Sequence, residues 1–266
     1  MKKLLLLVVF LVVCSCAPVN AQILQGRVSN SYSGTSTPLL NGGGTRSNVI
    51  TFSHISIGDV IVVGCSNDEY PKQVFNNPAT GLAQADVNGI PLSQAWVQQL
   101  PLQSGTPITT EYYGLNMPVG AVTITVRTFG TATNGHGTAC FAMDLFGVSK
   151  ANAIDSVQSQ SIPQNPLHSQ SNAATCSYTA QSDDDGNAAV MYFYTTNYGG
   201  IPGPTITASP VQPGANEMTG HWGAPGAAIA FSGPIRAGST FSETWNISGG
   251  NTGAAISVGA IIFRKA

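Results

Sequence analysis

Charged side chains are scarce in this chain of 266 residues: Asp, Glu, Lys and Arg make up 8% of it, and the formal net charge is −2. An ordinary soluble protein carries about 25% of these residues. No basic patch is expected, which excludes nucleic acid as a partner. Apolar residues still make up 42% of the chain, so a packed core is predicted rather than disorder. Hydroxyl and amide side chains supply the polarity, as is common in secreted β proteins and surface assemblies.

Long apolar runs are also missing, except at the N-terminus. Lys2 and Lys3 precede Leu4–Val13, an unbroken run of Leu, Val and Phe. A helix that crosses a bilayer needs about 20 apolar residues, so this run is too short to be a stable anchor. We interpret residues 1–21 as a signal peptide, with small residues at its end in Val19-Asn20-Ala21. The mature protein is therefore expected outside the cytoplasm, secreted or in the cell envelope.

The end of this leader also allows a second interpretation. Val13-Cys14-Ser15-Cys16 resembles a bacterial lipobox, in which Cys16 would become the lipidated first residue of the mature chain. Under the alternative, Cys14 and Cys16 are ordinary apolar leader residues. Contact with a membrane is expected only through such a lipid.

Cysteines are few in the mature part and odd in number. Cys65, Cys140 and Cys176 each lie in an apolar, strand-like run. Export favours disulfides, but free cysteines are also frequent core residues. One bridge with one buried thiol and no bridge at all both remain open, and the sequence does not select a pairing.

Amphipathic helices of ten or more residues are absent, and the periodicity is that of β-strands. Ala121–Arg127 alternates Val, Ile and Val with Thr, Thr and Arg, as a half-buried strand requires. Asp59–Ser66 is apolar on both faces, which suits a central strand. Together with Gly- and Asn-rich turns, these segments predict an all-β, two-sheet antiparallel β-sandwich of jelly-roll type, in one domain over residues 48–266. Residues 22–47, poor in large apolar side chains, are expected to form an extended arm or linker, and no repeat at a fixed period is visible.

The order of these segments carries a resemblance. Gly58–Gly64 precedes a Pro-x-Gly hairpin at Pro118–Val126, then a strand ending Phe-Gly-Val at 146–148, then Gly-Asn-Ala-Ala-Val at 186–190. This order resembles bacterial exported jelly-roll modules of the concanavalin A-like or LamG-like type. The resemblance covers most of residues 48–266 but includes no chemical motif. It implies adhesion or glycan binding, and it supplies no catalytic residue.

Familiar catalytic motifs are missing as well. There is no Gly-x-Ser-x-Gly, no His-x-x-x-His and no Cys-x-x-Cys, so neither a serine hydrolase nor a zinc enzyme is indicated and no cofactor is expected. A glycoside hydrolase needs two carboxylates facing each other across a cleft. None of the glutamates has an acidic partner two or four residues away; they are Glu69, Glu111, Glu217 and Glu243. A non-enzymatic protein is predicted, with a glycosidase as the less favoured alternative.

One acidic run superficially resembles a calcium loop. Asp183 and Asp185 flank Asp184 before the turn Gly186-Asn187. Calcium loops place oxygen ligands at alternating positions with a distant bidentate carboxylate, which three consecutive aspartates do not provide. A solvated hairpin turn is the preferred interpretation, with Asp183 and Asp185 kept as metal candidates.

Aromatic side chains supply the candidate ligand site, because glycan sites stack sugar rings on aromatic faces. Trp222 and Tyr198 lie in Gly-rich stretches, and Tyr192 and Tyr194 share one strand face; core packing is the alternative for each. The first functional hypothesis is an exported module that binds a glycan or a cell-surface polymer. The second is a structural subunit of an envelope or extracellular assembly, which self-associates by adding the arm at 22–47 to a neighbour's sheet.

Overall fold

The computed structural model describes residues 22–33, 44–54, 60–67, 73–74, 85–99, 108–130, 138–162, 173–195, 205–209, 216–218, 226–248 and 256–266. Within these ranges the chain forms 18 β-strands and no helix, and every strand pairing is antiparallel. A search of the same residues for a helix able to span a membrane found none. The predicted all-β antiparallel fold is confirmed, but the described residues form four sheets rather than the two expected, because each half of the chain builds its own pair.

The N-terminal half, up to residue 146, contains two sheets. Its inner sheet has the strand order β1 (Leu24–Ser33), β10 (Thr138–Phe146), β3 (Val60–Asn67), β8 (Ile108–Gly114) and β7 (Ser93–Gln99). Its outer sheet has the order β2 (Gly44–His54), β9 (Gly120–Gly130), β5 (Ala85–Val87) and β6 (Ile90–Pro91), with β4 (Gln73–Val74) also paired to β9.

The C-terminal half, from residue 154, contains two more sheets. Its inner sheet has the order β11 (Ile154–Ile162), β18 (Ile256–Phe263), β13 (Ala188–Thr195), β16 (Gly226–Ser232) and β15 (Asn216–Met218). Its outer sheet has the order β12 (Ala173–Thr179), β17 (Thr240–Ser248) and β14 (Thr205–Ser209). The chain thus builds four sheets, two in each half.

The two halves share one strand order. When the short strands β4 and β6 are left out, each half contributes eight strands, β1–β10 in the first and β11–β18 in the second. In both halves the inner sheet runs first-eighth-third-sixth-fifth, and the outer sheet runs second-seventh-fourth. β12 therefore corresponds to β2, and β17 corresponds to β9. The same topology is built twice by sequences without a visible repeat.

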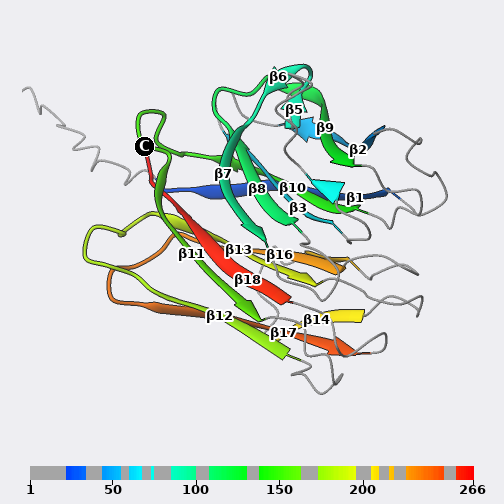
Figure 1. Ribbon diagram of the computed structural model, residues 1–266. Coiled ribbons are helices and arrows are strands. Elements are labelled where there is room, and N and C mark those ends of the chain that lie inside the picture. The colour runs from blue at the N-terminus through cyan, green and yellow to red at the C-terminus, as the bar shows by residue number, and fades with distance from the viewer. Residues whose placement is uncertain are drawn as a thin grey trace, which may run out of the picture.

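The four sheets stack as layers, with the two inner sheets face to face and the two outer sheets on opposite sides of the molecule (Figure 1). Three apolar clusters fill the spaces between the layers. The first joins the N-terminal sheets and includes Ile50 and Ile124, and the second joins the inner sheets through Phe141 and Ile261. The third joins the C-terminal sheets and includes Trp245.

The central strand β3 explains why some segments are apolar on both faces. Val60 and Val62 face the C-terminal inner sheet, whereas Ile61 and Val63 face the N-terminal outer sheet, and all four are buried. An inner sheet is covered on both sides, so alternation disappears from its sequence. The prediction of a central strand within Asp59–Ser66 is confirmed for the described part, Val60–Ser66.

Part of the range expected to form an arm, residues 22–47, belongs to the sheets. β1 lies at the edge of the N-terminal inner sheet and pairs with β10, and β2 already begins at Gly44. The physical reason is that backbone pairing needs no apolar side chain, so an edge strand of Gln, Ser and Asn residues looks like a linker in composition. Ile23, just before β1, is fully buried. The described parts of the expected arm therefore pair with strands of their own chain.

Candidate functional site

The predicted aromatic platform is contradicted at Tyr192. This side chain is fully buried between the inner sheets, where its hydroxyl donates to the Gln158 carbonyl oxygen at 3.4 Å. A Cβ on Gly259 would collide with the Tyr192 ring, so the glycine makes room for the tyrosine. Tyr192 is a core residue because β13 lies at the centre of an inner sheet. Tyr194, on the same strand as Tyr192, lies opposite Ala227 on β16 and Ser257 on β18.

The remaining predictions for the leader and loops are not tested by the described residues. Trp222, Tyr198 and Cys16 all lie outside those residues, and so does the side chain of Tyr194. Of the four aromatic candidates, only Tyr192 therefore has a described environment, and that environment is the core.

The acidic run forms a turn whose middle residue is structural. Asp183 and Asp185 are exposed, but Asp184 is fully buried. The Asp184 carboxylate accepts hydrogen bonds from the Tyr178 hydroxyl, from the Gln181 amide at 2.6 Å and from Asn187 Nδ2 at 3.0 Å. Both carboxylate oxygens are thus occupied by the protein. Among the described residues, no three His, Cys, Asp or Glu side chains gather as a metal site.

The same network extends from Asp184 to both sides. Asn187 Oδ1 accepts from the Lys265 amide at 3.0 Å, which ties the turn to the C-terminal segment. Burial, followed by the hydrogen bond to Asp184, raises the pKa of Tyr178 well above its usual range. Tyr178 is therefore a neutral donor. The sequence did not predict this network, because nothing in three consecutive aspartates marks the middle one as buried.

A second buried polar contact joins the layers of the N-terminal half. His54 Nδ1, at the end of β2, lies 2.6 Å from Asp144 Oδ1 on β10, and both side chains are 0% exposed. Gly26 on β1 makes room for this pair, since a Cβ there would lie 2.7 Å from Asp144 Oδ2. A catalytic dyad must reach its substrate, whereas this pair is sealed between sheets. We assign it a structural role that holds the outer sheet to the inner one.

A third buried polar group lies in the C-terminal half. Glu243 on β17 is directly opposite Cys176 on β12, and both face the core beside Trp245. Burial raises the pKa of the Cys176 thiol to about 12, and the neighbouring Glu243 carboxylate contributes in the same direction. A thiol with such a pKa is not nucleophilic at neutral pH. Glu243 faces the interior of the protein. A glycosidase carboxylate would instead face a cleft that the substrate can enter.

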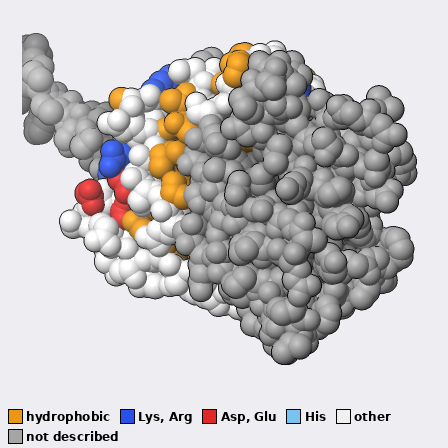
Figure 2. All heavy atoms as spheres, viewed as in Figure 1, with side chains coloured by type: hydrophobic (Ala, Val, Ile, Leu, Met, Phe, Trp, Pro, Cys, Tyr) orange, Lys and Arg blue, Asp and Glu red, His pale blue; other side chains and the backbone are white. Residues whose placement is uncertain are grey.

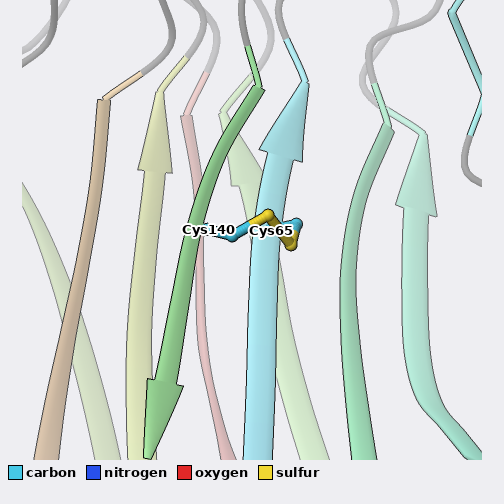
Figure 3. The surroundings of a disulfide bond; sticks show 2 residues. All are labelled: Cys65 and Cys140. Atoms are coloured by element: carbon cyan, nitrogen blue, oxygen red, sulfur yellow. A yellow bond between two sulfur atoms is a disulfide. The ribbon is translucent and has the colours of Figure 1, made fainter. Parts of the chain in front are cut away.

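The other two cysteines of the described residues are joined. Cys65 on β3 and Cys140 on β10 lie directly opposite each other and form a disulfide across neighbouring strands of the N-terminal inner sheet (Figure 3). Cys176 is the buried free thiol. Of the open alternatives, the structure shows one bridge and one core thiol.

Among the described residues, the feature that best fits ligand contact is the outward side of the C-terminal outer sheet. Six hydroxyl side chains on β12 and β17 point away from the core, and all are exposed or half-buried: Thr175, Ser177, Thr179, Thr240, Ser242 and Thr244. We call these six residues the hydroxyl face. Thr175 Oγ1 lies 2.7 Å from Thr244 Oγ1, and Thr179 Oγ1 lies 3.0 Å from Thr240 Oγ1.

The hydroxyl face arises from strict alternation along two strands. On β17 the intervening residues Phe241, Glu243 and Trp245 turn inward, so the outward positions are left to Thr and Ser. Strands lie about 4.8 Å apart and outward side chains recur about every 6.8 Å along each strand. β14 continues the rows by register, with Ser209 opposite Thr244. The result is an ordered, uncharged array of hydroxyls.

The corresponding face of the N-terminal outer sheet has a different character. Thr51 on β2 is opposite Thr123 on β9, and both are exposed, but Val49 beside them is 50% exposed. Arg127 forms an ion pair with Asp86 at 2.5 Å on the same sheet. Figure 2 likewise shows few charged side chains on the described surface of this view. Of the two outer sheets, as far as their side chains are described, only the C-terminal one combines regularity with the lack of charge.

The chain matches no family model, no curated protein and no solved structure. The class that the fold defines is an antiparallel β-sandwich of four layers. What it does must therefore be inferred from the chemistry of its own residues.

Proposed function

We propose that this protein is an exported, non-catalytic module that binds an uncharged, hydroxyl-rich polymer such as a glycan on a cell or extracellular surface. The observation that carries the proposal is the hydroxyl face. Its six outward side chains are all Thr or Ser. In two of its cross-strand pairs, the two hydroxyls are hydrogen-bonded to each other. A hydroxyl has one donor and two acceptor positions, so each paired hydroxyl keeps capacity for a ligand.

The lack of charge supports a neutral ligand. An uncharged polymer that covered a charged side chain would remove its hydrating water without supplying an opposite charge, which is costly. Hydroxyls exchange water for sugar hydroxyls at little net cost, and Thr methyl groups add apolar contact. A broad, flat and neutral array fits an extended polymer better than a small anion or a basic peptide.

Two further observations support export and a non-enzymatic role. The Cys65–Cys140 bridge agrees with an oxidising compartment, as does the leader. The buried polar groups His54, Asp144 and Asp184 hold sheets and turns together inside the fold. We therefore place the function on an outer surface.

The test measures depletion of the protein from solution by insoluble neutral polysaccharides, namely cellulose, chitin and a β-glucan. Ser242→Glu places a charge in the middle of the hydroxyl face and is expected to weaken binding at least about tenfold, because the carboxylate would be desolvated without a partner. Thr123→Glu is the matched control, since it makes a similar change on β9, the strand that corresponds to β17. It should leave binding unchanged.

Thermal unfolding of both variants checks that the fold is intact. The proposal is wrong if the unaltered protein binds none of these polymers. It is also wrong if Thr123→Glu and Ser242→Glu weaken binding equally, because the hydroxyl face would then not be the contact surface.

A further inference from the structure

The edge strands of the four sheets differ in how they are protected. Exposed edges present unpaired backbone groups that template further pairing, and proteins blunt them with bulges, short strands, Lys or Pro. Register irregularities interrupt β1, β7 and β11. The other edge strands β6, β14 and β15 are short, at two, five and three residues.

β12 has neither protection. It pairs with β17 over all seven residues, Ala173–Thr179, without a register shift. It contains no Lys and no Pro, and no other described strand pairs with its far side. β2 is also long and regular, but β1 runs alongside it. Among the described residues, β12 is thus the long and regular edge that remains open.

We propose that β12 pairs antiparallel with β12 of a second copy of this chain, about a two-fold axis at Ser177. The two C-terminal outer sheets would then join into one continuous sheet of six strands. A two-fold interface brings the same surface of both copies together and closes after two subunits. This pairing does not depend on the polymer binding proposed above.

The side chains of β12 are complementary to themselves in this register. On the outward side, Ser177 meets its own copy and Thr175 meets Thr179 of the second copy. These are the same kinds of pair that β12 already makes with β17, where Thr175 lies opposite Thr244 and Ser177 opposite Ser242. Cross-strand Thr and Ser pairs stabilise sheets, and like charges directly opposite destabilise them.

On the inward side, the register sets Cys176 opposite Tyr178 of the second copy, so two apolar-facing positions meet. A second copy is favoured over an unrelated peptide because Thr175, Ser177 and Thr179 all meet hydroxyl side chains and no charge is brought into the junction. A register shifted by one residue toward the N-terminus would leave Thr179 opposite Ala173 instead. The hydroxyl pairs therefore select Ser177 as the centre.

The first experiment measures the concentration dependence of molecular mass by sedimentation. The unaltered protein is expected to dimerise, and Ser177→Lys is expected to weaken the dimer at least about tenfold, because two ammonium groups would meet at the axis. Ser242→Lys adds the same charge to the same face one strand further in, where it is remote from the axis, and should leave the dimer intact. Ser177 and Ser242 are both exposed, so neither change disturbs the core.

The second experiment tests the geometry itself. Opposed residues of an antiparallel pair have Cβ atoms about 5 Å apart, close to the distance that a disulfide needs. Ser177→Cys should therefore cross-link two copies under mild oxidation, whereas Ser242→Cys should not. A protein that stays monomeric at all concentrations overturns the proposal, as would be expected if β12 instead receives a strand of another protein. A dimer that survives Ser177→Lys, or one that Ser177→Cys does not cross-link, overturns it too.

Discussion

Removing the disulfide should weaken this fold by a large and calculable amount. Cys65 and Cys140 lie on neighbouring strands but are separated by 75 residues in the chain. Closing a loop of that length reduces the entropy of the unfolded chain, which corresponds to about 4 kcal/mol at 25 °C. The double variant Cys65→Ala/Cys140→Ala should lose this amount from its free energy of unfolding. Since domains are typically stable by about 5 to 15 kcal/mol, the variant should be close to its limit.

Urea unfolding followed by Trp fluorescence measures the effect. Trp96 on β7 and the buried Trp245 on β17 place a fluorescent residue in each half, so a single transition would indicate that the two halves unfold together. The bridge acts on the unfolded chain, which becomes more expanded without it, so the variant should show a larger dependence of its free energy on urea as well as a lower midpoint. Cys176→Ala is the control, because that cysteine is buried without a bridge. Equal midpoints for the double variant and the unaltered protein would refute the loop-closure reasoning.

Two further changes probe the buried polar groups of the C-terminal half. Asp184→Asn should lower the free energy of unfolding by about 3 kcal/mol, because an amide NH₂ would face one of the donors that the carboxylate now accepts from; Asp183→Asn, exposed beside it, should cost less than about 0.5 kcal/mol in the same urea titration. Equal losses would contradict the role of Asp184. Since the pKa of Cys176 is raised from 9.0 to about 12 in the fold, the native state holds a proton that the unfolded chain releases, so stability should fall as pH rises from about 9 toward 12. Cys176→Ala should reduce this slope most between about pH 9 and pH 10, because the raised pKa of Tyr178 acts in the same direction above pH 10. An unchanged slope below pH 10 would show that another group is responsible.

The positions of strands were predictable from the sequence wherever one face of a sheet is buried and the other is exposed to solvent. Val122, Ile124 and Val126 on β9 are buried, with exposed Thr123 and half-buried Thr125 between them, as the alternation predicts. On β17 the same alternation places Trp245 in the core. The number of layers was not predictable, because a segment that is apolar on both faces says that it is covered twice but not by which sheets.

The buried polar groups were beyond sequence reasoning for a different reason. The pairing of His54 with Asp144 depends on two strands of different sheets being stacked, and their separation along the chain carries no signal. Tyr192 misled for the opposite reason: an aromatic residue on a strand has the same pattern whether it faces a ligand or a neighbouring layer. Only the position of β13 at the centre of an inner sheet decides between the two.

Correspondence between the halves gives the open edge of β12 its meaning. β2 and β12 occupy the same place in one topology, so the rules of the fold treat them alike. β1 nevertheless runs alongside β2, whereas β11 does not run alongside β12. If the topology alone determined whether this edge is covered, β2 and β12 would both be flanked or both be open. Among the described residues, β2 is flanked whereas β12 is open, regular and uncharged. The difference is therefore a property of this sequence, and β12 also supplies half of the hydroxyl face that we propose for binding.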